Sequence, residues 1–179
     1  MWNFTGGADG ANPIGGIVAD AAGNLYGGTI SSGAHDQGTI FKLVPSGNTY
    51  RETTLLAFNG SNGSSSSGIL AMDPKGALFD GTLFGTTTWG GAYGLGAAFG
   101  VSKDGTRESV IWSFGSGNDG VNPTGMTIDA KGELFGTTVV GVPSAAVPSL
   151  NSRPTTAVTR SESFGILDAP ATEGIRLPP

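Results

Sequence analysis

Three sequence elements recur along the chain in the same order, at a spacing of 53–58 residues. An aromatic element occurs as WNF (2–4), LAF (56–58) and WSF (112–114). An apolar stretch with a turn occurs as GGIVADAAGNLYGGT (15–29), SGILAMDPKGALFDGT (67–82) and TGMTIDAKGELFGTT (124–138). A third element occurs as GTIFKLVPSGNTY (38–50) and AAFGVSKDGTRES (97–109). Recurrence at this period constrains the fold strongly, because each unit must form one module that packs on its neighbours.

Within each unit, short runs rich in β-branched and aromatic residues are bounded by Gly, Asn or Asp, as strands are. The turns DAAGN, DPKGA and DAKGE pair an Asp that initiates a hairpin turn with a Gly that allows a positive φ. These structural turn positions are Asp20, Gly23, Asp73, Gly76, Asp129 and Gly132. Helical periodicity is absent. Four strands in about 50 residues predict an all-β fold made of four-stranded antiparallel blades, as in a β-propeller.

The predicted propeller-type region covers residues 1–140 and is an incomplete array. Its units are an end strand and turn (about 1–13), two fuller units (14–58 and 67–114) and a partial unit (124–140). A closed propeller takes about four to eight blades. Because terminal units expose apolar faces and strand edges, we expect marginal stability or self-association through those blade edges.

Two local features refine the unit boundaries. The turn GADGANP (7–13) recurs as GNDGVNP (117–123), and we interpret it as the link between units, with the proline where no ladder N–H is needed. In the second unit LF-x-GT occurs twice, at 78–82 and 83–87. Either a bulge absorbs the extra residues or one copy forms a loop.

The composition changes abruptly in the C-terminal tail. Residues 141–179 hold six of the ten prolines but only three of the 32 glycines. This bias is typical of a low-order, irregular linker or tail. A second hypothesis is that the tail is a further blade translated in the wrong reading frame. Codons that encode residues 141–152, when they are read from the third base of each codon, can encode GAVGGGTVFKL. The coding DNA sequence decides between the two.

Together these elements resemble the GloVer tandem-repeat family of bacterial proteins, whose units combine L-x-S-F-x-G-x-D-G-x-N-P, D-x-x-G-N-L-Y-G-T-T and G-T-V-F-K-L. The matching segments are Trp2–Pro13, Asp20–Thr29, Gly38–Leu43, Trp112–Pro123 and Asp129–Thr138, with a looser second unit. The resemblance implies β-propeller-like repeats in an extracellular or cell-surface protein, and it implies no catalytic residues. The N-terminal sequence MWNFTGGADG itself has neither the basic region nor the apolar run of a signal peptide.

Charge and composition argue against several functional classes. The net charge is −5 and the nine Lys and Arg residues are scattered, so we expect no nucleic-acid partner. No apolar run approaches the roughly 20 residues of a membrane span. The chain has no cysteine, which excludes disulfides and cysteine-ligated zinc. We expect no cofactor and no resident metal.

Few residues are candidates for a binding site. Trp89, Tyr93 and Tyr26 form a candidate ligand surface for a carbohydrate or a protein, or else they cover the core. The repeated turn aspartates are explained by turn formation rather than by acid–base chemistry. Asp9 and Asp119 are duplicated in the same way, although turn carboxylates can also form a weak calcium site.

The leading functional hypothesis is a non-enzymatic repeat scaffold or binding module, as a fragment of a longer exported protein. One alternative is part of a propeller-type enzyme, a glycosidase or a lyase, which would need unique polar residues that converge on a central channel. The other alternative is a non-functional gene remnant. Because the polar residues here mostly repeat from unit to unit, they favour the scaffold.

Overall fold

The computed structural model describes residues 2–73, 82–116, 119–130 and 132–140, and the regular structure of these residues is entirely β. The ten strands are β1 (Ala11–Ala19), β2 (Leu25–Ser31), β3 (Thr39–Ser46), β4 (Thr49–Ala57), β5 (Ser64–Met72), β6 (Leu83–Trp89), β7 (Ala97–Val101), β8 (Glu108–Ser113), β9 (Val121–Ile128) and β10 (Leu134–Val140). Every strand pair is antiparallel. The predictions of an all-β fold and of four-stranded antiparallel sheets are therefore confirmed.

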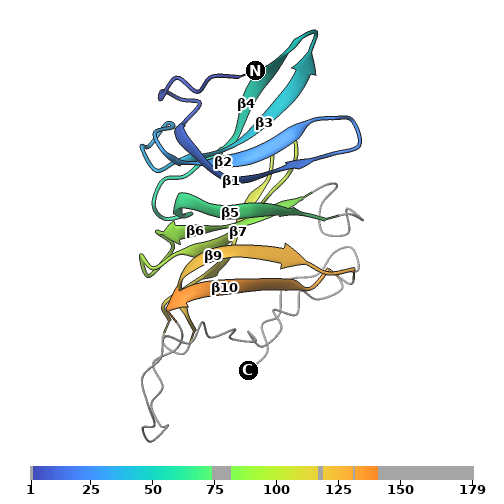
Figure 1. Cartoon of the computed structure of the whole chain (residues 1–179). Coiled ribbons are helices and arrows are strands. Elements are labelled where there is room, and N and C mark those ends of the chain that lie inside the picture. Colours follow the sequence, from blue (N-terminus) through green and yellow to red (C-terminus); the bar gives the residue numbers. More distant parts are fainter. Residues whose placement is uncertain (1, 74–81, 117–118, 131, 141–179) are drawn as a thin grey trace, which may run out of the picture.

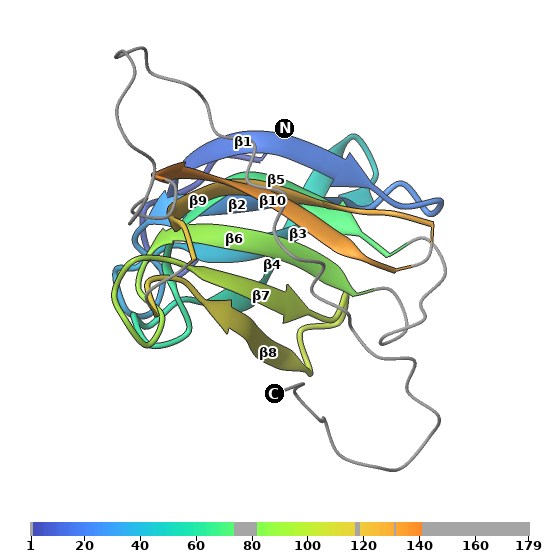
Figure 2. The same cartoon turned by 90° about the horizontal axis from the view of Figure 1, so that it is seen from below.

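The strands form three sheets that follow the chain. Two four-stranded sheets have the orders β1-β2-β3-β4 and β5-β6-β7-β8, and β9 pairs with β10 in a third sheet. Figure 1 shows the sheets as successive layers in which β5 lies between β1 and β9, and Figure 2 shows the same stack from below. In the described part of the chain the three sheets are separate, and none closes into a barrel. The tail at 141–179 lies outside the described residues.

The first strand of each sheet begins earlier than the sequence pattern predicts. Asn12 and Pro13, which the sequence placed in a turn, are part of β1, where Pro13 pairs with Thr29. Pro123 likewise belongs to β9. A proline is compatible with these strands because each is an edge strand of its sheet, so one side of its backbone needs no ladder donor.

The second copy of the doubled LF-x-GT motif forms strand β6. Leu83–Thr87 lie in β6, and Leu83 pairs with Met72 just as Leu25 pairs with Ala19 in the first sheet. The first copy falls largely in residues 74–81, outside the described residues, as does the turn glycine Gly76. The strand register therefore matches that of the first sheet despite the insertion.

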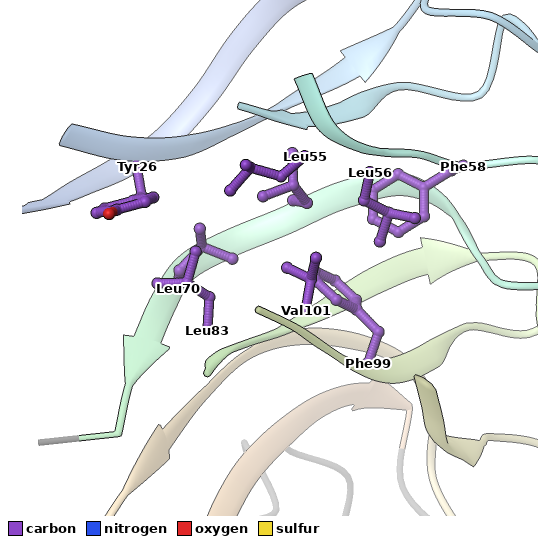
Figure 3. Close-up of a cluster of buried hydrophobic side chains, with 9 residues drawn as sticks. Tyr26, Leu55, Leu56, Phe58, Leu70, Leu83, Phe99 and Val101 are labelled. Carbon is purple, nitrogen blue, oxygen red and sulfur yellow. The ribbon is translucent and has the colours of Figure 1, made fainter. Parts of the chain in front are cut away.

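The main hydrophobic core lies between the first two sheets. Side chains from both sheets meet there, as Figure 3 shows: Tyr26, Ile40, Leu55, Leu56, Phe58, Leu70, Leu83, Phe99 and Val101. Phe58 and Phe99 pack edge to face with ring centroids 5.1 Å apart. A smaller cluster of Ala71, Phe84 and Leu134 joins the second sheet to the third. Strands β5 and β6 thus bury apolar side chains on both faces, which makes the second sheet the centre of the stack.

Glycines allow the three edge strands to approach closely. Gly15 and Gly68 hold equivalent places in β1 and β5, and both have positive φ angles, of 80° and 74°. A Cβ atom on Gly15 would overlap the carbonyl group of Gly68, and one on Gly68 would overlap the carbonyl group of Thr124. Each of these glycines lies at a break in strand register, between Ile14 and Val18 or between Ser67 and Ala71. The stacking of the sheets therefore depends on residues without side chains.

Candidate functional site

The first turn aspartate is fully engaged in its own turn. The Asp20 carboxylate accepts hydrogen bonds from the backbone N–H groups of Ala22 and Asn24, each at 3.0 Å. It also accepts from Asn24 Nδ2 and from the Tyr26 hydroxyl, both at 2.9 Å. Gly23 completes the turn with a φ of 80°. These bonds hold the β1–β2 hairpin closed, and they engage both oxygens of the carboxylate within the hairpin itself.

Electrostatics agree with this structural role. Burial alone would raise the pKa of Asp20, but the hydrogen bonds from Asn24, Tyr26 and Ala22 outweigh it and lower the pKa to about 2. For Tyr26, burial and the neighbouring carboxylate both raise the pKa of the phenol. At neutral pH the pair is an ionised carboxylate and a neutral phenol, so neither is poised to exchange a proton.

The equivalent aspartates in the other sheets, Asp73 and Asp129, make equivalent contacts where these are described. Asp129 accepts a hydrogen bond from the Glu133 N–H at 2.9 Å, and Gly132 has a φ of 92°. Asp73 is buried, and its backbone N–H donates to the carbonyl oxygen of Thr82 at 3.0 Å. The carboxylate contacts of Asp20 and Asp129 fit their interpretation as turn residues, and Asp73 makes the equivalent backbone hydrogen bond.

The two candidate calcium aspartates also bind groups of their own loops. Asp9 accepts from the Thr5 N–H at 2.8 Å and from the Thr5 hydroxyl at 2.7 Å. Asp119 accepts from Trp112 Nε1 at 2.9 Å and from the Gly115 N–H at 3.1 Å. Within the described residues, no three His, Asp or Glu side chains gather closely enough to hold a metal ion.

The three aromatic candidates do not form one surface. Tyr26 is fully buried in the core between the first two sheets, so its assignment to a ligand surface is wrong. The ring lies between the first and second sheets, and its burial there removes it from contact with any ligand. Trp89, at the end of β6, and Tyr93, in the loop that follows, remain 51% and 55% exposed. These two residues are the part of the proposed ligand surface that solvent can reach.

A small depression lies at the outer strand of the second sheet. It has a volume of about 120 Å³ and is lined by Leu56, Asn62, Phe99, Glu108, Ser109 and Val110. Pockets for small organic ligands usually measure roughly 300–1,000 Å³. The depression is too small to enclose such a ligand.

The junctions between sheets carry a repeated pair of hydrogen bonds that the sequence pattern did not predict. At the first junction, the Ser65 N–H donates to the Gln37 carbonyl at 2.8 Å, and Ser65 Oγ donates to the Ile30 carbonyl at 3.0 Å. At the second, the Asn122 N–H donates to the Leu95 carbonyl at 2.8 Å and Asn122 Nδ2 to the Thr88 carbonyl at 2.9 Å. Each donor residue thus ties its own sheet to the preceding one.

An unusual backbone conformation places these donors. Ser65 and Asn122 have φ angles of 58° and 54°, and Asn12 at the equivalent place in β1 also has 54°. Asn tolerates this left-handed conformation better than most residues, which is the one sequence signal that could have identified the position. At Ser65 and Asn122 the left-handed backbone thus accompanies hydrogen bonds between sheets.

No protein-family model, curated protein or solved structure matches the chain. The described part of the chain contains no helix that is long and apolar enough to cross a membrane.

Proposed function

We propose that this chain is a non-enzymatic repeat scaffold of the β-propeller type, related to the GloVer proteins and part of a longer exported protein. The single observation that carries the proposal is the equivalence of its sheet junctions. Ser65 and Asn122 make the same pair of hydrogen bonds to the preceding sheet, and Gly15 and Gly68 make the same close approach to the next. A scaffold needs this regularity, because each unit must dock on its neighbours in the same way.

The placement of the acidic residues also supports a scaffold. The carboxylates of Asp9, Asp20 and Asp129 accept hydrogen bonds from their own turns. An enzyme of the propeller type needs polar groups that leave the repeat pattern and converge on a shared cavity. The repeated turn aspartates instead accept hydrogen bonds within their own loops, so their chemistry is used to shape those turns.

We propose further that Trp89 and Tyr93 contact the ligand of this scaffold, and that the ligand is a carbohydrate. Both rings are about half exposed at the end of the second sheet. Exposed aromatic faces on a rigid strand end can stack on the flat apolar face of a sugar ring at little entropic cost. The second sheet, which carries them, packs on both neighbouring sheets and so supports the end of the strand.

Affinity electrophoresis through gels that contain soluble polysaccharides tests this assignment. The full chain is expected to be retarded by at least one polysaccharide, and Trp89→Ala is expected to weaken retention about 2- to 10-fold, the usual worth of one aromatic contact. Val110→Ala is the matched control, because Val110 is also exposed but lies on the outer strand β8. Equal retention of the wild type and the Trp89 and Tyr93 variants would refute the ligand surface.

A further inference from the structure

Each internal junction buries the same trio of side chains. At the first junction Tyr26 of one sheet packs in a cluster with Leu70 and Leu83 of the next. At the second junction Phe84 takes the place of Tyr26, and it clusters with Leu134 and the partly buried Met126. We call the face of a sheet that points toward the next sheet along the chain its forward face, and the opposite face its backward face. The trio thus combines one aromatic residue on the forward face of a sheet with two aliphatic residues on the backward face of the next.

The backward face of the first sheet exposes its half of such a trio. Ile17 holds the place of Leu70 in the repeat, yet it is 54% exposed, whereas Leu70 is 4% exposed. Leu25 holds the place of Leu83 and is only partly buried. The same sheet carries Asn12 at the position of Ser65 and Asn122, and its Nδ2 donates to Ser31 Oγ within its own sheet.

The forward face of the third sheet exposes the other half. Phe135 of β10 holds the place of Tyr26 and Phe84 but is 40% exposed, whereas Phe84 is 3% exposed. Val139, which holds the place of Thr88 in its strand, is also exposed. The Thr88 carbonyl accepts the junction hydrogen bond from Asn122 Nδ2. The third sheet therefore offers an aromatic ring and a carbonyl group at the two places where a following sheet would use them.

The two free faces also match in extent. On the first sheet the part over β3 is already covered, because Phe4 packs on Phe41 with ring centroids 4.7 Å apart. This contact repeats that of Phe58 on Phe99 at the next junction. What remains open is the part over β1 and the start of β2, where Ile17 is exposed and Leu25 is partly buried. The described third sheet has two strands, β9 and β10.

We propose that the face of β9–β10 binds the face of β1–β2 of a second copy of this chain, head to tail. In this contact Phe135 packs on Ile17 and Leu25 of the second copy, and Asn12 Nδ2 of the second copy donates to the Val139 carbonyl. The contact joins two different surfaces, so it leaves one of each free and continues into longer assemblies unless the rotation closes a ring. This proposal rests on the proposed scaffold function only in so far as both assume equivalent sheet junctions. It does not depend on the proposed carbohydrate ligand.

Sedimentation velocity of the full chain over a micromolar concentration series tests the contact. The wild type is expected to show a weight-average mass that rises with concentration above that of the monomer, without limit for an open assembly or to a fixed value for a closed ring. Ile17→Asp and Phe135→Asp are each expected to weaken association at least about tenfold, because each leaves a charge against an apolar surface. Val110→Asp is the control, since Val110 is exposed on β8, outside both faces. Phe135→Ala replaces Phe135→Asp if the latter loses its β-sheet circular dichroism.

A mixing experiment separates this head-to-tail contact from other modes. The Ile17 variant keeps an intact β9–β10 face and the Phe135 variant keeps an intact β1–β2 face. An equimolar mixture of the two is therefore expected to form a 1:1 dimer and nothing larger. Failure of the mixture to associate, a wild type that stays monomeric, or variants that associate like the wild type would each overturn the proposal. Loss of polysaccharide retention alone would refute the ligand surface and leave this contact standing.

Discussion

Substitution of one glycine, Gly68→Ala, tests how the sheets are stacked. Gly68 lies in β5 with a φ of 74°, and an added Cβ atom would overlap the Thr124 carbonyl group and the Gly125 Cα of β9. Both obstacles are backbone atoms, so no side-chain rotation can relieve the overlap. Gly94 provides a matched control, because its φ is also 74° but an added Cβ atom would meet nothing within 4 Å.

Both substitutions strain the backbone, but only Gly68→Ala also creates a steric overlap with a neighbouring strand. An alanine held in the left-handed region costs about 1–2 kcal/mol at either position. At Gly68 the overlap adds the cost of overpacking, about 1–3 kcal/mol, because β5 and β9 must move apart. We therefore expect Gly68→Ala to reduce the free energy of unfolding by about 2–5 kcal/mol and Gly94→Ala by about 1–2 kcal/mol.

Urea unfolding of the full chain, followed by circular dichroism, measures this difference. The expected result is a clearly lower midpoint for Gly68→Ala than for Gly94→Ala at a similar dependence on urea concentration. Equal midpoints for the two variants would refute the reasoning, because they would show that β5 and β9 do not approach as closely as the structure requires.

Three further predictions concern the hydrogen bonds of the hairpins and junctions. The lowered pKa of Asp20, about 2 against an ordinary 3.8, adds about 1–2 kcal/mol of stability that is present above pH 4 and lost as the pH falls toward 2. The urea midpoint should therefore fall less between pH 7 and pH 3 for Asp20→Asn than for the wild type. An equal fall would show that the Asp20 carboxylate does not stabilise the fold. Tyr26→Phe removes one donor to Asp20 and should cost about 1 kcal/mol at pH 7; an unchanged urea midpoint would show that the bond adds nothing. Asn122→Gly keeps the left-handed backbone but loses the hydrogen bond to the Thr88 carbonyl, so its free energy of unfolding should fall by about 1 kcal/mol. Asn122→Ala should lose about another 1 kcal/mol, because alanine is strained in this conformation. The reverse order of the two variants in thermal melts would contradict this description of the junction.

The hairpin turns were predictable from sequence because their chemistry is local. An Asp followed three residues later by Gly sets a carboxylate against nearby N–H groups and supplies a positive φ. Both features are present at Asp20 and Gly23, where the donors lie within six residues of the carboxylate. Nothing outside the hairpin is needed to form them, so a single sequence contains the whole signal.

The buried position of Tyr26 was not predictable in the same way. Its neighbour Leu25 is also apolar, so the alternation that normally separates the core face of a strand from its solvent face is missing. One face of strand β2 packs into the core, and the other is partly covered by the Phe41 ring, which lies against Gly27. A strand that is covered on one face and partly covered on the other gives little signal about which of its residues reach solvent.

The junction residues Asn12, Ser65 and Asn122 depend on partners far along the chain. Ser65 bonds to carbonyls 28 and 35 residues away, and Asn122 to carbonyls 27 and 34 residues away. The middle copy also uses Ser in place of Asn, which hides the equivalence in the sequence. Only the stacked sheets bring these groups together, so the junction could be seen only once the layers were in place.

Native-state hydrogen exchange of the full chain tests the central claim, that equivalent sheets stack through their first strands, most directly. Strands β5 and β6 bury apolar side chains against both neighbouring sheets, whereas β1 and β10 each have one open face. The account predicts that the amides of β5 and β6 exchange most slowly, and that protection falls toward β1 on one side and β10 on the other. Equal protection of the β1–β2 and β5–β6 pairs would contradict it, because independent sheets have no protected centre.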